Sequence, residues 1–154
     1  SAADLIIDTS EMSPYNQREV IEQRFGTRRS GMSISIESFG FKKGAPLNAD
    51  LVLDMRMLAN PHWEPELREF TGREPKVAQF IEAHPETDSV ANDITNMLTQ
   101  WIPLYQKNQR AYLTIAIGCT GGKHRSVYMA ERIGKILSQT FEGISVTNRD
   151  IPFT

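Results

Sequence analysis

Residues 112–126 read YLTIAIGCTGGKHRS, and this stretch decides the fold. The apolar run 112–117 predicts a strand. A glycine-rich segment follows it, and residues 126–139 have the spacing of a helix. In an α/β sheet, the loop between a strand and the next helix is where a ligand usually binds. We therefore expect residues 118–126 to form a phosphate-binding loop.

Strands and helices alternate along the rest of the chain, which predicts an α/β fold with a mostly parallel sheet flanked by helices. The predicted strands are 5–7, 32–36, 51–53, 112–117 and 144–146, with 51–53 taken as buried. The predicted helices are 13–25, 76–83, a longer one from about residue 86 that Pro103 kinks or ends, and 126–139.

Two further segments carry specific expectations. Residues 58–72 are interrupted by prolines and a glycine, so we predict a long irregular loop that carries Asn60, His62 and Trp63. The long helix carries an apolar stripe that we expect to form core. The members of this stripe are Val90, Ile94, Leu98, Trp101, Ile102 and Tyr105.

Length and composition fit one globular domain, which we place at residues 4–154. The chain has 154 residues, 40% of them hydrophobic and 23% charged, and a net charge of −2. No apolar run reaches the roughly 18 residues that cross a bilayer, so we expect no membrane segment. A single cysteine allows no internal disulfide and indicates a reducing cytoplasm. The charge excludes a basic nucleic-acid footprint over the whole surface.

The loop itself combines several groups that bind phosphate. Gly121 and Gly122 let the backbone fold back, so that amide groups converge on one anion at a helix N-terminus. Arg125 offers a planar fork to two phosphate oxygens. Lys123 and His124 add positive potential, and the hydroxyls of Thr120 and Ser126 add donors. The alternative interpretation is a glycine-rich turn followed by a helix cap at Ser126.

Cys119 and Arg125 also have the Cys-x5-Arg spacing of protein tyrosine phosphatases, with a hydroxyl at Ser126. In that chemistry a cysteine thiolate attacks phosphorus, and a helix N-terminus favours the thiolate. A general acid would be needed, and Asp50 and Asp54 are candidates by residue type. The alternative for Cys119 is a small residue at the end of a strand.

Four strings in one order carry a resemblance that covers most of the chain. They are ESFGFKKG at 37–44, ADLVLDMR at 49–56, NPHW at 60–63 and AIGCTGGKHRSV at 116–127. From about Asp4 to about Leu137, the sequence resembles the C-terminal domain of the RapZ/YvcJ family of bacterial proteins.

The resemblance implies a fold likened to part of phosphofructokinase and a regulatory, non-enzymatic role. Members of the family carry an N-terminal P-loop domain that binds ATP or GTP. The P-loop motif is absent from this sequence, so no cofactor is expected in this domain. In enterobacterial members the C-terminal domain senses glucosamine-6-phosphate and binds small regulatory RNA. Those members engage RNase E or a sensor kinase, tune amino-sugar synthesis and form homo-oligomers. No metal is implied.

The resemblance also implies site residues. The sugar-phosphate pocket would involve His62, Cys119, Thr120, Gly122, His124 and Arg125. We expect Asp54, Arg56 and Asn60 to line or brace it, because they follow the strand at 51–53. The alternatives are that Asp54 pairs with Arg56 and that His62 packs beside Trp63.

RNA binding rests on fewer residues. RNA-binding members end in a basic tail, whereas this sequence ends in NRDIPFT with one basic residue. The remaining candidates are Arg28, Arg29, Lys42 and Lys43, which are either phosphate contacts or ordinary solvated charges. Three functions follow from the sequence: a sugar-phosphate sensor and adaptor, which we favour, a cysteine-dependent phosphatase, and a plain RNA-binding module.

Overall fold

The fold is a parallel sheet with helices on one side. A computed structural model describes residues 31–151. Within them four strands form one sheet in the order β2-β3-β1-β4, and every neighbouring pair is parallel. The strands are β1 (Ser33–Gly40), β2 (Leu51–Asp54), β3 (Tyr112–Cys119) and β4 (Ile144–Asn148). The helices are α2 (Pro75–Glu82), α3 (Pro85–Lys107) and α4 (Arg125–Leu137). The predicted α/β class is confirmed.

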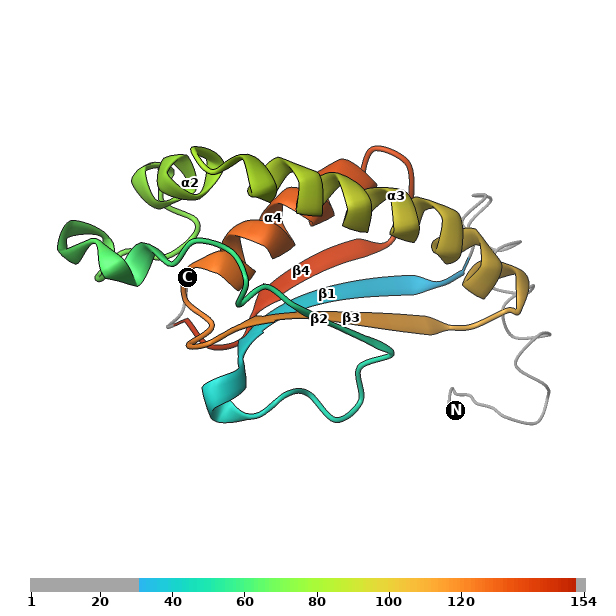
Figure 1. The fold of residues 1–154 in the computed structure, drawn as a ribbon. Helices are drawn as coiled ribbons and strands as arrows, with labels where there is room; N and C mark the ends of the chain where they lie inside the picture. The colour runs from blue at the N-terminus through green and yellow to red at the C-terminus, as the bar shows by residue number, and fades with distance from the viewer. Residues whose placement is uncertain (1–30, 152–154) are drawn as a thin grey trace.

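The core lies between the sheet and the helices. Figure 1 shows α2, α3 and α4 on the same side of the sheet. The central strands β1 and β3 pair in register along their whole length, with Ile36 opposite Ile115. Both side chains are fully buried. The α4 side chains Met129 and Ile133 are also fully buried and belong to the same apolar cluster.

Close packing of α4 on the sheet depends on one small residue. Gly134 lies on the sheet-facing side of α4, and a Cβ placed there would lie 2.4 Å from Cγ2 of Val146 on β4. Real Cβ atoms do not approach other carbons so closely. The missing side chain therefore sets how near the helix lies to the edge of the sheet.

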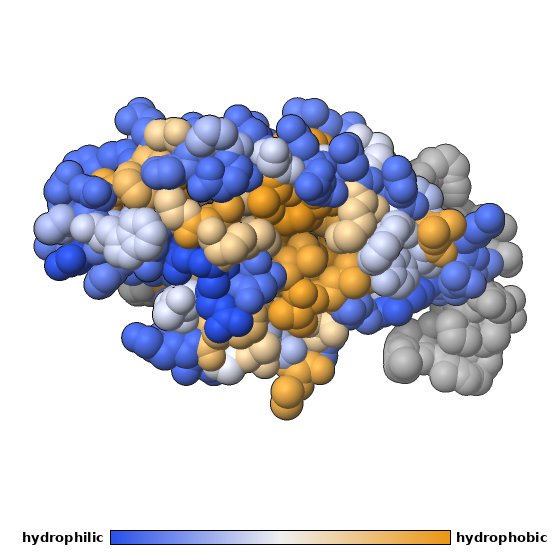
Figure 2. Space-filling view, in the orientation of Figure 1, coloured by the Kyte–Doolittle hydropathy of each residue, from blue (hydrophilic) through white to orange (hydrophobic). Residues whose placement is uncertain are grey.

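Strand β2 differs from its prediction. It forms at the predicted place, but it is an edge strand, and Val52 is 46% exposed. Leu51 and Leu53 are only half-buried. The prediction of a buried strand was wrong because an apolar triplet does not reveal that one side of the strand lacks a neighbour. Figure 2 shows apolar residues gathered below α3, on the face of the molecule that is turned toward the viewer.

Helix α3 also departs from expectation. It runs to Lys107, so Pro103 does not end it. The predicted core stripe holds for Ile94, Leu98 and Ile102, but Trp101 is 40% exposed. At 100° per residue, Trp101 lies about 60° round the helix from the middle of the buried face. It is therefore a flanking residue, and the assignment of Trp101 to the core was wrong.

The structure describes the predicted loop at 58–72, but it does not describe the predicted elements near the N-terminus. The segment 58–72 is not wholly irregular, since it contains the 3-10 turns η2 (Pro61–Trp63) and η3 (Pro65–Leu67). A third 3-10 turn, η1 (Phe41–Lys43), follows β1. The predicted strand 5–7 and helix 13–25, together with Arg28 and Arg29, lie outside the described residues.

Candidate functional site

The glycine-rich loop lies where the carboxyl ends of β1 and β3 meet the N-terminus of α4 (Figure 1). Two neighbouring segments hold its backbone. The amide of Lys42 donates to the carbonyl of Thr120 at 3.0 Å, and the amide of Gly72 donates to the carbonyl of Lys123 at 2.9 Å. Within residues 31–151, the amides of Gly121 and Gly122 donate to no backbone carbonyl. They remain available to a ligand.

Glycine is required at Gly122 and Gly40, and Gly121 has no such requirement. Gly122 has a φ of 77°, which disfavours other residues. A Cβ on it would lie 2.5 Å from the amide nitrogen of Gly40, and a Cβ on Gly40 would lie 2.4 Å from the carbonyl carbon of Gly121. A Cβ on Gly121 would meet nothing within 4 Å. The end of β1 therefore forms the backing on which the loop rests.

Arg125 is the first residue of α4, and its side chain is held inside the site. The residue is 5% exposed, and its Nη1 donates to the carbonyls of Arg56 at 2.8 Å and Leu58 at 3.1 Å. Its Nη2 lies 3.4 Å from Oγ1 of Thr120. Burial lowers the pKa of Arg125, and nearby Cys119 and Asp54 partly oppose that change. The Nε atom is buried and has no hydrogen-bond partner among the described residues.

His124 caps α4 through its backbone and is itself buried, at 6% exposed. Burial lowers the pKa of His124, and the positive charge of Lys123 lowers it further, while the backbone at Phe70 and Leu67 opposes the change. The imidazole is therefore neutral at pH 7. Its Nε2 atom, like Nε of Arg125, is buried without a partner in residues 31–151. Both nitrogens can serve a bound ligand.

Cys119 and Ser126 face each other behind the loop. Cys119 is 2% exposed, and its thiol donates to Oγ of Ser126 at 3.2 Å. Ser126 is fully buried within α4, whose cap is His124. The interpretation of Ser126 as the helix cap was therefore wrong. Its hydroxyl supports the thiol and does not point toward solvent.

A cavity of about 440 Å³ opens over the loop. It brings together most of the predicted site residues from four separate parts of the chain. Its lining consists of Lys42, Lys43, Asn60, His62, Arg68, Cys119, Thr120, Gly121, Lys123, His124, Arg125 and Asp150. Gly122 and Ser126 lie behind this lining and shape it. Lys42 and Lys43, which the sequence offered as RNA contacts, are exposed residues on its wall.

Asp54 and Arg56 do not line this cavity. They form an ion pair, with Nη2 of Arg56 at 2.8 Å from Oδ2 of Asp54, and each side chain is about half exposed. The hydrogen bond from Arg56 lowers the pKa of Asp54. The guanidinium of Arg56 also lies 4.0 Å from the ring centre of Phe41. The pairing alternative is thus the one observed, and Arg56 contributes to the site through the carbonyl that Arg125 contacts.

The residues at the mouth of the cavity come from η2 and its flanks. The Asn60 side chain accepts from the amide of His62 at 3.0 Å, and His62 itself is exposed. Arg68, which the sequence did not indicate, donates through Nε to the carbonyl of His62. The Nζ of Lys123 donates to the carbonyl of Arg68 at 2.7 Å. Arg68 therefore braces the 58–72 segment internally, and Lys123 fastens that segment to the loop.

The candidate general acids are not placed for catalysis. Asp50 precedes β2 and lies at the amino end of the sheet, where it accepts from Arg110 at 2.7 Å and from the amide of Thr114 at 2.8 Å. The loop lies at the opposite, carboxyl end. Asp50 is therefore excluded as a general acid for chemistry at Cys119, and Asp54 is engaged with Arg56.

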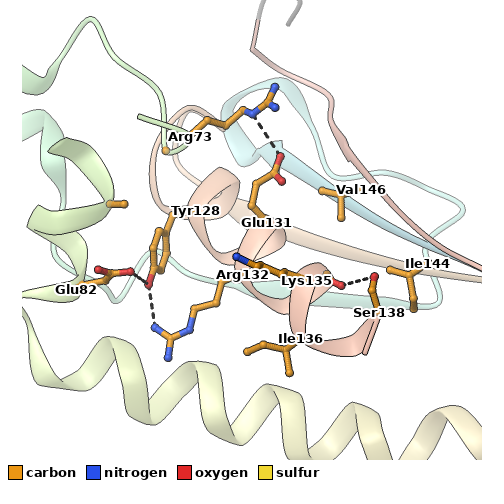
Figure 3. Close-up of a pocket in the computed structure, with 13 residues that line it drawn as sticks. Arg73, Glu82, Tyr128, Glu131, Arg132, Lys135, Ile136, Ser138, Ile144 and Val146 are labelled. Atoms are coloured by element: carbon orange, nitrogen blue, oxygen red, sulfur yellow. Dashed lines mark hydrogen bonds and ion pairs between the residues drawn. The ribbon is translucent and has the colours of Figure 1, made fainter. Parts of the chain in front are cut away.

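A second cavity of about 680 Å³ lies along the side of α4 (Figure 3), and its lining shares no residue with the first cavity. Its polar groups pair with one another. Tyr128 donates to Glu82 at 2.9 Å and accepts from Arg132 at 2.8 Å, and Arg132 also donates to Asp88 at 2.8 Å. These contacts join α2, α3 and α4. Among residues 31–151, this cavity therefore contains no counterpart to the buried nitrogens of His124 and Arg125 that lack a partner.

None of the helices in the described part of the chain has the length and apolar character of a membrane span. No group of three or more histidine, cysteine or acidic side chains is arranged to hold a metal ion within residues 31–151.

Fold and site together define a parallel α/β domain with a cationic, glycine-rich loop between a central strand and its following helix. The chain belongs to the RapZ C-terminal domain family, whose sequence profile it matches over residues 32–152. It is similar to proteins named "Nucleotide-binding protein" from Cellvibrio japonicus (48% identical), Pseudomonas putida (47%) and Azotobacter vinelandii (45%). In each case the match covers 97% of this chain and 51 to 53% of the relative, so the chain spans about half the length of these relatives.

Proposed function

We propose that this domain is a sensor that binds a phosphorylated amino sugar such as glucosamine-6-phosphate in the cavity over the loop. The observation that supports this proposal most is a pair of buried nitrogens, Nε2 of His124 and Nε of Arg125, that have no hydrogen-bond partner among the described residues and belong to the lining of one cavity. Buried polar atoms nearly always have partners, so two such atoms in one cavity favour a ligand that supplies acceptors.

The charge of the lining favours an anion. Five of its residues are lysine or arginine, and Asp150 is its one carboxylate. A phosphate monoester with two negative charges gains from each nearby cation and from the α4 N-terminus. The amides of Gly121 and Gly122 add donors at the same place. The phosphate group is therefore assigned to the loop side of the cavity.

The sugar part of the ligand is assigned to the mouth. Asn60 and His62 carry acceptors and donors that suit hydroxyl groups, and both line the cavity. The volume of about 440 Å³ is within the range of small-molecule sites. Family membership favours a phosphorylated amino sugar over other phosphate esters.

The adaptor role is the second part of the proposal. Lys42 and Lys43 are exposed and also line the cavity, so an anion in the cavity changes the potential that a partner meets there. We infer that the ligand state alters binding of a small regulatory RNA, or of a protein partner such as RNase E or a sensor kinase. We place this activity in the cytoplasm and in a homo-oligomer, as the family suggests.

Calorimetry tests ligand binding. Wild type, Lys42→Ala and Arg125→Ala are titrated with glucosamine-6-phosphate and with inorganic phosphate. Loss of a charge-assisted contact is worth about 1.5–3 kcal/mol, so each variant should weaken binding by roughly 10- to 100-fold. Arg110→Ala is the matched control, because Arg110 pairs with Asp50 at the opposite end of the sheet. Lys42 is exposed, so its replacement leaves the core intact.

The outcomes separate the parts of the proposal. Absence of heat with wild type would overturn ligand binding, and unchanged affinity in Lys42→Ala and Arg125→Ala would move the site elsewhere. Binding of phosphate with no preference for the sugar would remove the sensor assignment. RNA binding that ignores the sugar phosphate would separate the adaptor role from the cavity.

A cysteine-dependent phosphatase is the second candidate, because Cys119 and Arg125 line the same cavity. Turnover of an aryl phosphate by wild type, lost in Cys119→Ser, would favour this function. The burial of the thiol against Ser126 and the engagement of Asp54 argue for the sensor.

A further inference from the structure

The cavity contains one residue that an anion site would be expected to exclude. Asp150 is the carboxylate in the lining, and its side chain is 8% exposed. A negative charge repels a phosphate by Coulomb's law, so its presence requires a reason. The contacts of Asp150 and of its neighbour Arg149 supply that reason.

Asp150 holds the backing of the loop. Its Oδ2 accepts from the amide of Gly40 at 2.7 Å, across 110 residues of sequence. Gly40 is the last residue of β1 and touches the backbone of Gly121 and Gly122 so closely that a Cβ on Gly40 would collide with them. Fixing Gly40 therefore fixes the surface on which the loop rests.

Arg149 holds the basic turn η1, which directly follows Gly40. Its amide donates to the carbonyl of Ser38 at 3.0 Å, and its Nη2 donates to the carbonyl of Gly44 at 2.8 Å. Gly44 ends the turn η1, which carries Lys42 and Lys43 into the cavity lining. The position of this basic turn thus depends on the guanidinium of Arg149.

The two side chains also hold each other. Nε of Arg149 donates to Oδ1 of Asp150 at 3.0 Å, and Nη2 donates to Oδ2 at 2.8 Å. Burial opposes ionisation of Asp150, but the hydrogen bonds from Arg149 and Gly40 prevail and lower its pKa. The carboxylate is therefore charged at pH 7 and its charge is offset by Arg149.

We propose that Arg149 and Asp150 form a clamp that positions the backing of the loop and the basic turn η1 of the anion site, with Asp150 as a positioning residue that acts through Gly40. This inference rests on the proposed function, because it concerns the same cavity. It places a determinant of ligand affinity directly after β4, far in sequence from the loop.

The sign of one measurement distinguishes the clamp from simple electrostatics. If Asp150 acted only through its charge, its removal would strengthen phosphate binding. If it positions Gly40, its removal weakens binding although the net charge becomes more positive. Asp150→Asn keeps one acceptor oxygen for the Gly40 amide, and Asp150→Ala keeps none.

The experiment is a titration of the variants with inorganic phosphate, accompanied by amide hydrogen exchange without ligand. We expect Asp150→Ala to lose about 10-fold in affinity, as for removal of a charge-assisted hydrogen bond, and Asp150→Asn to lose less. Exchange at Gly40, Gly121 and Gly122 should accelerate in Asp150→Ala. The matched controls are Asp50→Ala and Asp50→Asn, since Asp50 also joins an arginine to a strand amide. Neither control should change either readout at the loop.

Each result has one meaning. Stronger or unchanged phosphate binding in Asp150→Ala, in a protein that melts as a folded domain, would overturn the clamp. If wild type binds neither inorganic phosphate nor glucosamine-6-phosphate, the proposed function fails, and the exchange rates still decide the clamp. Unchanged exchange at Gly40 would then overturn it. Faster exchange spread evenly over the sheet would show general destabilisation and would also overturn it.

Discussion

Arg125 combines burial with only partial charge compensation. It forms no ion pair within residues 31–151, and its partners there are backbone carbonyls and the Thr120 hydroxyl. Burying a charge that no direct ion pair neutralises is unfavourable. The domain therefore carries a cost in its unliganded state that an anion can offset.

A thermal-shift series measures this effect. Phosphate should raise the melting temperature of wild type, and at 100 times its Kd it should add about 2.7 kcal/mol of stability. At the same phosphate concentration, Arg125→Ala should show a clearly smaller shift, because its affinity is expected to be roughly 10- to 100-fold weaker. Sodium chloride at matched ionic strength is the control, and an equal rise with chloride would contradict a specific site.

His124 predicts a dependence of stability on pH. Its pKa is lowered in the folded state, so the unfolded chain binds the proton more readily. The contribution of His124 to stability is present above the ordinary pKa of about 6.5 and is lost as the pH falls through the lower folded value. Unfolding in urea from pH 8 to pH 5 should show a loss that is smaller in His124→Gln. Parallel curves for the two proteins would contradict the assignment.

At the residue scale, the sequence indicated the loop because its chemistry is contiguous. Gly122, His124 and Arg125 lie within four residues of one another, and the motif shows them directly. The role of Asp150 could not be predicted, because Gly40 and Asp150 are 110 residues apart and meet only in the folded chain. Arg68 gave no signal either, since one arginine in a polar segment is ordinary.

At the scale of the elements, the packing of α4 on the sheet depends on the absence of a side chain at Gly134. Two effects oppose each other in Gly134→Ala. Alanine favours a helix interior by about 1 kcal/mol, but overpacking in a core typically costs about 1–3 kcal/mol. Since the new Cβ would lie 2.4 Å from Val146, we expect the clash to prevail and the variant to be destabilised.

A double-mutant cycle provides the control. Val146→Ala removes the atom that the new Cβ meets, so the double variant Gly134→Ala/Val146→Ala should be less destabilised than the sum of the two single variants. Chemical denaturation measures all four proteins. Additive changes would show that α4 and β4 relax independently.

The helix layer carries a second titratable group. Burial raises the pKa of Tyr128 to about 12. Its ionised form is therefore less favourable in the folded than in the unfolded chain. Stability from this group is complete below pH 10 and falls as the pH rises toward 12.

Tyr128→Phe tests this account. The variant loses the hydroxyl that joins Glu82 to Arg132, at a cost of about 1 kcal/mol at pH 7. It should also lack the tyrosine contribution to alkaline destabilisation. A fall between pH 10 and 12 as steep as in wild type would assign the effect to other groups.

At the element scale, prediction succeeded where periodicity and burial coincide. The strand at 112–117 and the helix at 76–83 appear within two residues of their predicted ends. It failed where burial depends on neighbours that the sequence does not reveal. Val52 is apolar but lies at the edge of the sheet, and Trp101 is apolar but lies at the flank of α3.

For the whole molecule, the parallel arrangement decides where the site lies. All four strands of the described sheet point the same way. Gly40, Cys119 and the Arg149–Asp150 pair, at the ends of β1, β3 and β4, therefore lie together at the carboxyl end of the sheet. Helix α4 starts at the same end of the sheet. The site therefore depends on the integrity of the whole sheet and not on the loop alone.

Core truncation tests that dependence. Ile115 is fully buried in the middle of β3, and Ile115→Ala should cost about 2–5 kcal/mol. Tyr112→Ala in the same strand is the control, because Tyr112 is 70% exposed and should cost less than about 1 kcal/mol. Urea unfolding measures both. Equal costs would contradict the assignment of the core to the helix-covered side of the sheet.

The seclusion of Cys119 has a practical consequence. It is the sole sulfhydryl in the 154 residues, and it is 2% exposed behind the loop. A maleimide can react with this sulfur only when the surrounding backbone moves aside. The rate of alkylation therefore measures how often the loop opens, and no dye needs to be attached. Saturating phosphate should slow the reaction if the anion seals the loop, which makes the native sulfur a built-in reporter of occupancy.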